Sequence, residues 1–209
     1  MVRGKFITLE GIDGAGKSTH LQWLAGFVGS RGFPVRVTRE PGGTILGERL
    51  RELLLDRDQR LDPETETLLV FAARREHVQT VIGPALAAGT WVLCDRFTDA
   101  SYAYQAGGSG VAWERIETLE QWVHPDLQPD LTVLFDVAPE VARQRAQIGR
   151  VADRFEREEL AYFQRVREAY LRRARSCPDR MRVIDAGGGL SAVREALEAV
   201  VSALCAKAG

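Results

Sequence analysis

The sequence predicts an α/β fold: a five-stranded parallel sheet flanked by helices on both faces. Short apolar runs typical of buried strands alternate along the chain with longer stretches of helical periodicity. Strands that alternate with helices form parallel sheets, and the crossover helices cover both faces. The first apolar run leads at once into a glycine-rich loop. With 209 residues, of which 45% are hydrophobic, the chain is expected to form one domain over residues 1–209.

The expected elements follow from these patterns in order along the chain. Asp62-Pro63 and Pro139-Glu140 place a proline and an acid at helix starts, and Gly32 and Gly89 follow helix ends. Strands are expected at residues 6–9, 35–38, 91–94, 131–135 and 181–184. Helices are expected at residues 17–30, 46–55, 63–88, 113–123, 139–147, 157–177 and 191–206.

The glycine-rich loop reads Gly-Ile-Asp-Gly-Ala-Gly-Lys-Ser at residues 11–18. Glycines let consecutive backbone N–H groups turn toward the oxygens of a polyphosphate. Lys17 adds a positive charge, and the hydroxyl of Ser18 can bind Mg²⁺. The chain has three lysines, so composition does not explain one at this position. A glycine-rich turn that binds nothing is the alternative, and the pattern favours a polyphosphate site.

Composition argues against several classes of partner. The net charge of −1 gives no general attraction to nucleic acids or membranes, so neither is expected as a partner. Glu10, Asp13 and Lys17 interrupt the N-terminal stretch, and no apolar run reaches about 18 residues. A cytoplasmic location is therefore expected. The three cysteines and three histidines show no metal-binding spacing.

Charged side chains follow the expected strands, at the edge of the sheet where ligands bind in such folds. Asp95 follows the third run and is expected near Mg²⁺, although Asp136 follows the fourth run in the same way. We prefer Asp95 because Arg96 is next to it. Arg96, with Arg39 and Arg51, is expected to form a second anion site; surface ion pairs are the alternative. Two phosphate sites indicate two nucleotides.

Basic side chains are concentrated between residues 143 and 157, in a segment with few large apolar residues. Such a segment can act as a lid that brings arginines to a transferring phosphoryl group and excludes water. A solvated helix face is the alternative, and the loop at residues 11–18 favours the lid. The arginines are Arg143, Arg145, Arg150, Arg154 and Arg157.

Further short motifs are spread along the chain: Asp13 within the loop, Arg-Glu-Pro-Gly-Gly-Thr at 39–44, Phe-Ala-Ala-Arg at 71–74, Asp-Arg-Phe at 95–97, Ala-Tyr-Gln at 103–105, Pro-Asp-Leu-Thr at 129–132 and Asp-Arg-Phe-Glu at 153–156. Together they resemble the bacterial thymidylate kinase family, nearly end to end. The resemblance implies a three-layer P-loop nucleoside monophosphate kinase fold with a short basic lid at about 143–157. It also implies ATP and Mg²⁺ as cofactors, dTMP as acceptor, and a homodimer.

The resemblance assigns residues to each ligand. For ATP these are Gly11, Ile12, Asp13, Gly14, Ala15, Gly16, Lys17, Ser18, Thr19, Arg145 and Ala186. For dTMP they are Asp13, Arg39, Pro41, Arg51, Phe71, Arg74, Arg96, Ser101, Tyr104 and Gln105. Mg²⁺ is assigned to Ser18 and Asp95, and the transferring phosphoryl group to Lys17, Asp95 and Arg96 together with a lid arginine, for which we expect Arg150.

Within the dTMP set, the resemblance places Arg74, Ser101 and Gln105 on thymine and Asp13 near the sugar 3′-hydroxyl. Tyr104 would crowd the position of a ribose 2′-hydroxyl, which implies selection for deoxynucleotides.

Three positions depart from the family pattern. The glycine-rich stretch after Gln105 usually carries an arginine where Ser109 stands. The phenylalanine that usually stacks on thymine, four residues before the base-reading arginine, is replaced by Val70. Either Phe71 stacks from the next position, or Arg75 is the reader instead of Arg74. In the lid, the usual Arg-Gly order is reversed at residues 149–150, which leaves Arg150 as our expectation for the arginine at the γ-phosphoryl group.

Other functions fit less well. A kinase for a neutral acceptor such as a deoxynucleoside would have no use for a second arginine site. A GTP-dependent switch needs an Asn-Lys-x-Asp guanine reader, and the chain contains no asparagine. A protein that binds ATP without catalysis would differ only in its lack of turnover.

Overall fold

The structure is a computed structural model that describes residues 2–56, 58–146 and 159–206. Its strands all run parallel, in the order β2-β3-β1-β4-β5, which confirms the expected α/β class. Each expected strand extends by one charged residue, so that acids or an arginine end every strand at one edge of the sheet. The strands are β1 (Phe6–Glu10), β2 (Val35–Arg39), β3 (Trp91–Asp95), β4 (Leu131–Asp136) and β5 (Met181–Asp185).

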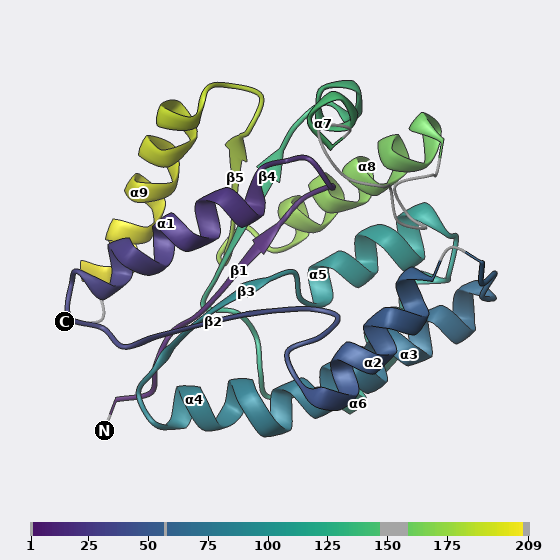
Figure 1. Cartoon of the computed structure of the whole chain (residues 1–209), viewed down its shortest axis with the longest axis horizontal. Helices are drawn as coiled ribbons and strands as arrows, with labels where there is room; N and C mark the ends of the chain where they lie inside the picture. The colour runs from purple at the N-terminus through teal and green to yellow at the C-terminus, as the bar shows by residue number, and fades with distance from the viewer. Residues whose placement is uncertain (1, 57, 147–158, 207–209) are drawn as a thin grey trace.

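Helices lie on both faces of the sheet. Figure 1 shows α1 and α9 side by side along one face, and α2, α3 and α6 gathered at the other end of the molecule. The helical segments are α1 (Lys17–Gly29), α2 (Ile45–Leu55), α3 (Pro63–His77), η1 (Val78–Ile82), α4 (Gly83–Ala87), α5 (Thr98–Ser101), η2 (Tyr102–Gly108), α6 (Trp113–Val123), α7 (Pro139–Ala146), α8 (Leu160–Ser176) and α9 (Leu190–Ala206).

Two helical segments differ from expectation. The helix expected at 63–88 is divided into α3, the π-helical η1 and α4, because Pro84 has no N–H to donate to the regular hydrogen-bond ladder. The second difference is a helical stretch that periodicity did not indicate, formed by α5 and η2 directly after β3. This stretch carries residues expected to contact dTMP.

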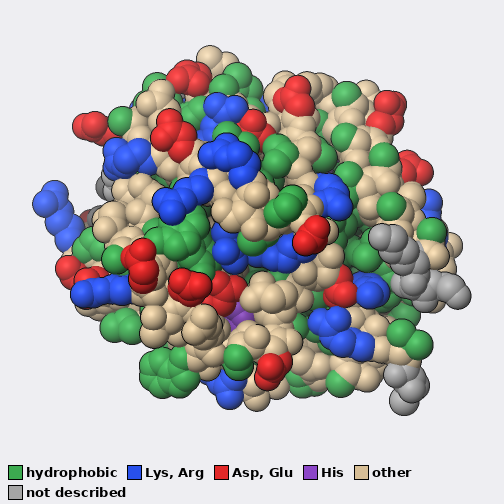
Figure 2. All heavy atoms as spheres, turned by 180° about the vertical axis from the view of Figure 1, so that it is seen from behind, with side chains coloured by type: hydrophobic (Ala, Val, Ile, Leu, Met, Phe, Trp, Pro, Cys, Tyr) green, Lys and Arg blue, Asp and Glu red, His purple; other side chains and the backbone are tan. Residues whose placement is uncertain are grey.

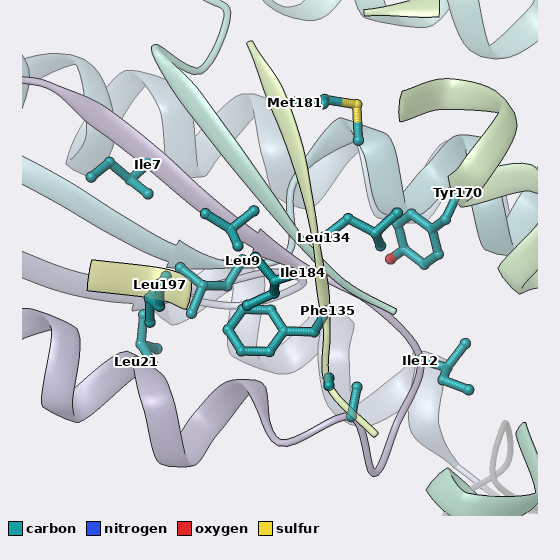
Figure 3. Packing of buried hydrophobic residues seen from close by; sticks show 14 of the residues in the cluster. Ile7, Leu9, Ile12, Leu21, Leu134, Phe135, Tyr170, Met181, Ile184 and Leu197 are labelled. Carbon is teal, nitrogen blue, oxygen red and sulfur yellow. The ribbon is translucent and has the colours of Figure 1, made fainter. Parts of the chain in front are cut away.

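The core packs against both faces of the central strands. Figure 3 shows Leu9 and Phe135 pointing toward Leu21 of α1 and Leu197 of α9, whereas Leu134 lies toward Tyr170 of α8. Successive side chains of a strand point to opposite faces, so each central strand contributes to both layers. The strands are thereby held rigidly, and the loops at their carboxyl ends start from fixed positions.

Charges of both signs are interspersed with hydrophobic side chains on the face seen in Figure 2, as a net charge of −1 suggests. Among the described residues, no helix is both long and apolar enough to cross a membrane.

Candidate active site

The glycine-rich loop connects β1 to the N-terminus of α1 and depends on its glycines. Gly11, Gly14 and Gly16 have φ values of 137°, 82° and 92°, a region that residues with a Cβ atom rarely adopt. A Cβ atom on Gly14 would lie 2.1 Å from the carbonyl oxygen of Ala142 in α7. The loop is thus a compact turn that packs against α7 and leads into the N-terminus of α1.

Lys17 lies over this loop. Its ammonium group is buried and donates hydrogen bonds to the carbonyl oxygens of Gly11 at 2.9 Å and Ile12 at 3.1 Å. Burial lowers the pKa of Lys17, and Arg96 adds to this effect. The lysine is therefore held at the mouth of the loop rather than extended into solvent.

A cavity of about 720 Å³ opens in front of the loop. One end is bordered by α7 and the loop after β5, where Arg145 donates to the carbonyl oxygens of Ala186 at 2.7 Å and Gly187 at 3.0 Å. The other end is bordered by arginines from three different elements. The cavity-lining residues that the sequence predicted are Asp13, Gly14, Ala15, Gly16, Lys17, Ser18, Thr19, Arg39, Arg51, Asp95, Arg96, Arg145 and Ala186.

Asp95 and Asp136, which the sequence alone did not separate, have different surroundings. Asp136 forms a two-point ion pair with Arg167, at 2.6 Å and 2.8 Å. Asp95 lies on the cavity, where the hydroxyl of Ser18 donates to its Oδ2 at 3.3 Å. Its Oδ1 is buried and has no hydrogen-bond partner within the described part of the chain. Asp95 is therefore the carboxylate that remains available to a cation.

Arg96 stands where this cavity meets a second one. Its guanidinium donates to the loop carbonyl of Gly11 at 2.9 Å and to Oδ1 of Asp13 at 2.8 Å. It also donates to the hydroxyls of Tyr104 at 2.9 Å and Tyr170 at 3.1 Å. Burial alone would raise the pKa of Asp13, but Arg96 and Lys17 lower it to about 2.

The second cavity, of about 90 Å³, lies beyond Arg96 and is partly apolar. Arg74 is fully buried at its wall and donates to Glu40 at 2.7 Å and Ser101 at 3.1 Å. Gln105 is buried too, and its Nε2 donates to Glu66 at 2.9 Å. The residues that line this cavity and also belong to the predicted dTMP set are Asp13, Pro41, Arg51, Arg74, Arg96, Ser101, Tyr104 and Gln105.

Phe71 does not face this cavity, contrary to expectation. Val70 lines the cavity in the place where Phe71 was expected. Successive helix residues point about 100° apart, so Val70 and Phe71 point in different directions, and of the two it is Val70 that lines the cavity. Phe71 packs in an apolar cluster with Tyr102, and the guanidinium carbon of Arg74 lies 4.5 Å from its ring centre. Phe71 thus contacts the guanidinium of Arg74 from outside the cavity.

Arg75, the alternative base reader, also lies outside the cavity. Its guanidinium donates to the carbonyl oxygen of Val123 at 2.9 Å, on the side of α3 that packs against α6. The geometry therefore favours Arg74 as the cavity arginine.

Arg39 and Arg51 line the larger cavity. Arg39 pairs with Glu48 at 2.8 Å, and Arg51 donates to the carbonyl oxygen of Pro41 at 3.0 Å. The side chain of Arg39 is 54% exposed, so its guanidinium can exchange this partner for an anion. Of the basic segment, Arg143 and Arg145 lie in α7, whereas Arg150, Arg154 and Arg157 lie outside the described residues.

Sequence reasoning missed the buried acids behind the site. Glu40 joins Arg74 to His77, and Glu66 holds the amide of Gln105. Glu10, fully buried at the end of β1, binds the backbone N–H of Phe97. The sequence does show that Glu10 directly follows an apolar run, but the partners of its carboxylate could be known only from the fold.

Comparisons with known proteins agree with this site. The family model described as "Thymidylate kinase" matches residues 9–197. A thymidylate kinase of Nitrosomonas europaea is 61% identical over 201 residues, which cover 96% of this chain and 94% of that protein. One of Bordetella pertussis is 60% identical over 206 residues, covering 99% and 98%.

A crystal structure of thymidylate kinase from Ehrlichia chaffeensis superposes with a TM-score of 0.78 at 35% identity, covering 95% of this chain and 99% of that one. The phosphate-binding loop, the arginine-lined cavities and these full-length matches lead to one conclusion: the chain belongs to the thymidylate kinase family and phosphorylates dTMP to dTDP with ATP.

Proposed function

We propose that the larger cavity holds ATP, that the smaller one holds dTMP, and that the phosphoryl group passes between them beside Arg96. The observation that carries this proposal is the position of Arg96, which lines both cavities and is bonded to the phosphate-binding loop. Transfer between two bound nucleotides needs positioning and charge neutralisation more than covalent chemistry. A guanidinium held between the two phosphates supplies both.

On the donor side, the backbone N–H groups of residues 11–19 bind the phosphates, and Lys17 contacts the β- and γ-phosphates. Lys17 is already over the loop, so it needs only to exchange its carbonyl partners for phosphate oxygens. The adenine lies against Arg145 and Ala186, which are hydrogen-bonded to each other at that end of the cavity. Arg150 remains our expectation for the arginine at the γ-phosphoryl group.

We propose that Mg²⁺ is held at Ser18 and Asp95. A free, buried carboxylate oxygen beside a hydroxyl is the hard oxygen donor set that hydrated Mg²⁺ prefers. When bound, the ion neutralises charge on the β- and γ-phosphates. Asp95 and Ser18 orient it relative to the loop.

On the acceptor side, Arg39, Arg51 and Arg96 bind the phosphate of dTMP. Asp13 contacts the sugar, and its low pKa keeps it ionised as a hydrogen-bond acceptor. The thymine contacts are Arg74, Ser101 and Gln105, and Pro41 lines the same cavity.

Tyr104 is the basis for selecting deoxynucleotides. Its hydroxyl is fixed by Arg96 and Asp13, at 2.9 Å and 3.3 Å, so the ring cannot easily move aside for a 2′-hydroxyl. A 2′-hydroxyl forced against this fixed ring would overpack the site, which disfavours a ribonucleotide.

We further propose that the protein is one domain, cytoplasmic and homodimeric. A single sheet joins strands from both ends of the chain, and the cysteines are free thiols, which suits a reducing compartment. A groove of about 400 Å³ between α3 and α6 exposes 56% of Leu68 and 78% of Trp122. A second copy of the chain would bury this apolar surface.

The test is a coupled assay of ADP release with a panel of nucleoside monophosphates. We expect dTMP to be the best acceptor, to lead dUMP modestly and to lead ribo-TMP by more. Faster turnover of CMP, AMP or GMP than of dTMP at equal subsaturating concentrations would refute the assignment of the smaller cavity. Binding of ATP without turnover of any acceptor would refute catalysis altogether.

A further inference from the structure

Arg96 is held in an unusual backbone conformation. Its φ of 69° is the one positive value at a residue other than glycine within the described part of the chain. This region is unfavourable for a residue with a Cβ atom, so surrounding contacts must maintain it. The contacts that maintain it also decide where the guanidinium points.

Glu10, at the end of β1, supplies such contacts on both sides of Arg96. Its Oε1 accepts a hydrogen bond at 2.7 Å from the backbone N–H of Phe97, the next residue. Its Oε2 accepts one at 2.8 Å from the hydroxyl of Tyr170 in α8. That hydroxyl in turn accepts a hydrogen bond at 3.1 Å from Nη1 of Arg96. Glu10 therefore acts on the backbone and the side chain of Arg96 without touching its guanidinium.

The direction of these hydrogen bonds requires a carboxylate. A guanidinium only donates, a backbone N–H only donates, and the tyrosine hydroxyl has a single hydrogen to give. Tyr170 can accept from Arg96 and donate onward only if Glu10 accepts. A glutamine at this position would accept at one oxygen but turn its NH₂ toward the other donor, so one of the two contacts would be lost.

The surroundings of Glu10 disfavour its ionised form. Burial and, after it, Asp99 of α5 raise the pKa of Glu10, and its net value of about 8 makes the carboxylate the main form above that pH. Arg96, the hydroxyl of Tyr170 and the N–H of Phe97 act in the opposite direction. The groups that stabilise the carboxylate are thus the same groups that connect it to Arg96.

We propose that Glu10 is a positioning residue that aims the guanidinium of Arg96 between the two cavities, through the Phe97 backbone and the Tyr170 hydroxyl. The inference rests on the proposed function, in which Arg96 contacts the phosphate of dTMP and the transferring group. A misplaced Arg96 guanidinium affects the acceptor and the chemical step more than ATP binding. Arg96 makes one hydrogen bond to the loop, at the carbonyl of Gly11, whereas the phosphates of ATP are bound by the backbone N–H groups of the loop and by Lys17.

The experiment compares Glu10→Gln, Tyr170→Phe and the double variant in steady-state kinetics above pH 8, where Glu10 is ionised, with circular dichroism melts to confirm folding. Each single variant is expected to lower kcat/KM for dTMP about ten-fold, equivalent to about 1.4 kcal/mol. The affinity for ADP, measured by calorimetry, should change by less than about two-fold. The double variant should lose about as much as one single variant, because both substitutions break one connected set of contacts.

Tyr102→Phe is the matched control. It removes another buried tyrosine–glutamate hydrogen bond, from Tyr102 to Glu120 at 2.6 Å, and no hydrogen bond or ion pair among the described residues connects this pair to Arg96. It should leave kcat/KM for dTMP within about two-fold of wild type.

Three outcomes would overturn the inference: wild-type kcat/KM in both single variants, losses that add in the double variant, or an equal loss in Tyr102→Phe. If Glu10→Gln fails to fold, Tyr170→Phe decides by the same criterion. Absence of dTMP turnover in the wild-type protein would overturn the proposed function and the inference with it, whereas turnover indifferent to both substitutions would overturn the inference alone.

Discussion

Replacement of Arg74 by methionine should destabilise the protein in a pH-dependent manner. Arg74 is 1% exposed, and its Nε donates to Glu40 at 2.7 Å. Its other nitrogens donate to Ser101 at 3.1 Å and to the carbonyl of Phe97 at 3.2 Å. Methionine fills much of the volume but leaves a buried carboxylate whose remaining partner is His77. Arg74→Met is therefore mainly a test of the charge.

The magnitude follows from the burial of the pair. Breaking a buried ion pair by removal of one partner costs about 3–5 kcal/mol. For a chain of this length, each kcal/mol lowers Tm by about 2–4 °C, so a loss of about 4 kcal/mol corresponds to roughly 8–16 °C. The change is large because the cost is the uncompensated charge, beyond the hydrogen bonds themselves.

The sign of the pH dependence reverses in the variant. In the wild type, burial raises the pKa of Glu40. Arg74 and His77 lower it by more than this, so the pKa lies below its usual value. The ion pair therefore stabilises the protein above the unfolded-state pKa, and this contribution is lost as the pH falls. Without Arg74 the burial effect dominates and the folded-state pKa is raised. The variant's penalty is then absent at acidic pH and grows as the pH rises.

Urea unfolding of wild type and Arg74→Met at pH 5 and pH 8 measures this difference. We expect the deficit to be larger at pH 8, and the double variant Glu40→Gln/Arg74→Met to recover much of the stability without recovering dTMP binding. A deficit below about 1 kcal/mol, or one equal at both pH values, would refute the reasoning.

Four further predictions concern the site and the surface. Lys17→Ala should lower turnover by about 10² or more with little change in unfolding; near-wild-type turnover would exclude the loop as the donor site. Asp95→Asn should raise the Mg²⁺ concentration for half-maximal turnover by about ten-fold, and an unchanged requirement would place the ion elsewhere. Trp122→Asp should convert a dimer to a monomer in sedimentation velocity, unless the groove is not the interface. Arg150→Ala should lower kcat and kcat/KM for dTMP by similar factors, and an unimpaired single-turnover step would move the role to Arg154 or Arg145.

Local patterns were enough to predict the sheet, the phosphate-binding loop and most helix boundaries. Buried parallel strands need uninterrupted apolar runs, and turns with positive φ need glycine, so both leave a mark within a few residues. The cap at Asp62, whose side chain accepts from the N–H of Glu64 at 2.9 Å, is of the same kind. Asp95, Arg96 and Lys17 could be singled out because strand ends meet at one edge of the sheet.

Tertiary structure decided which side of a helix faces the cavity and which charges are paired. Whether Val70 or Phe71 faces the smaller cavity depends on the rotation of α3 against its neighbours, and both residues are apolar enough to be buried. Glu40 and Arg74 are 34 residues apart, and Glu10 and Tyr170 are 160 apart, so no local pattern connects them. The sequence alone determined where phosphate-binding groups are gathered; only the packed fold determined how those groups are aimed, because aim depends on contacts between distant segments.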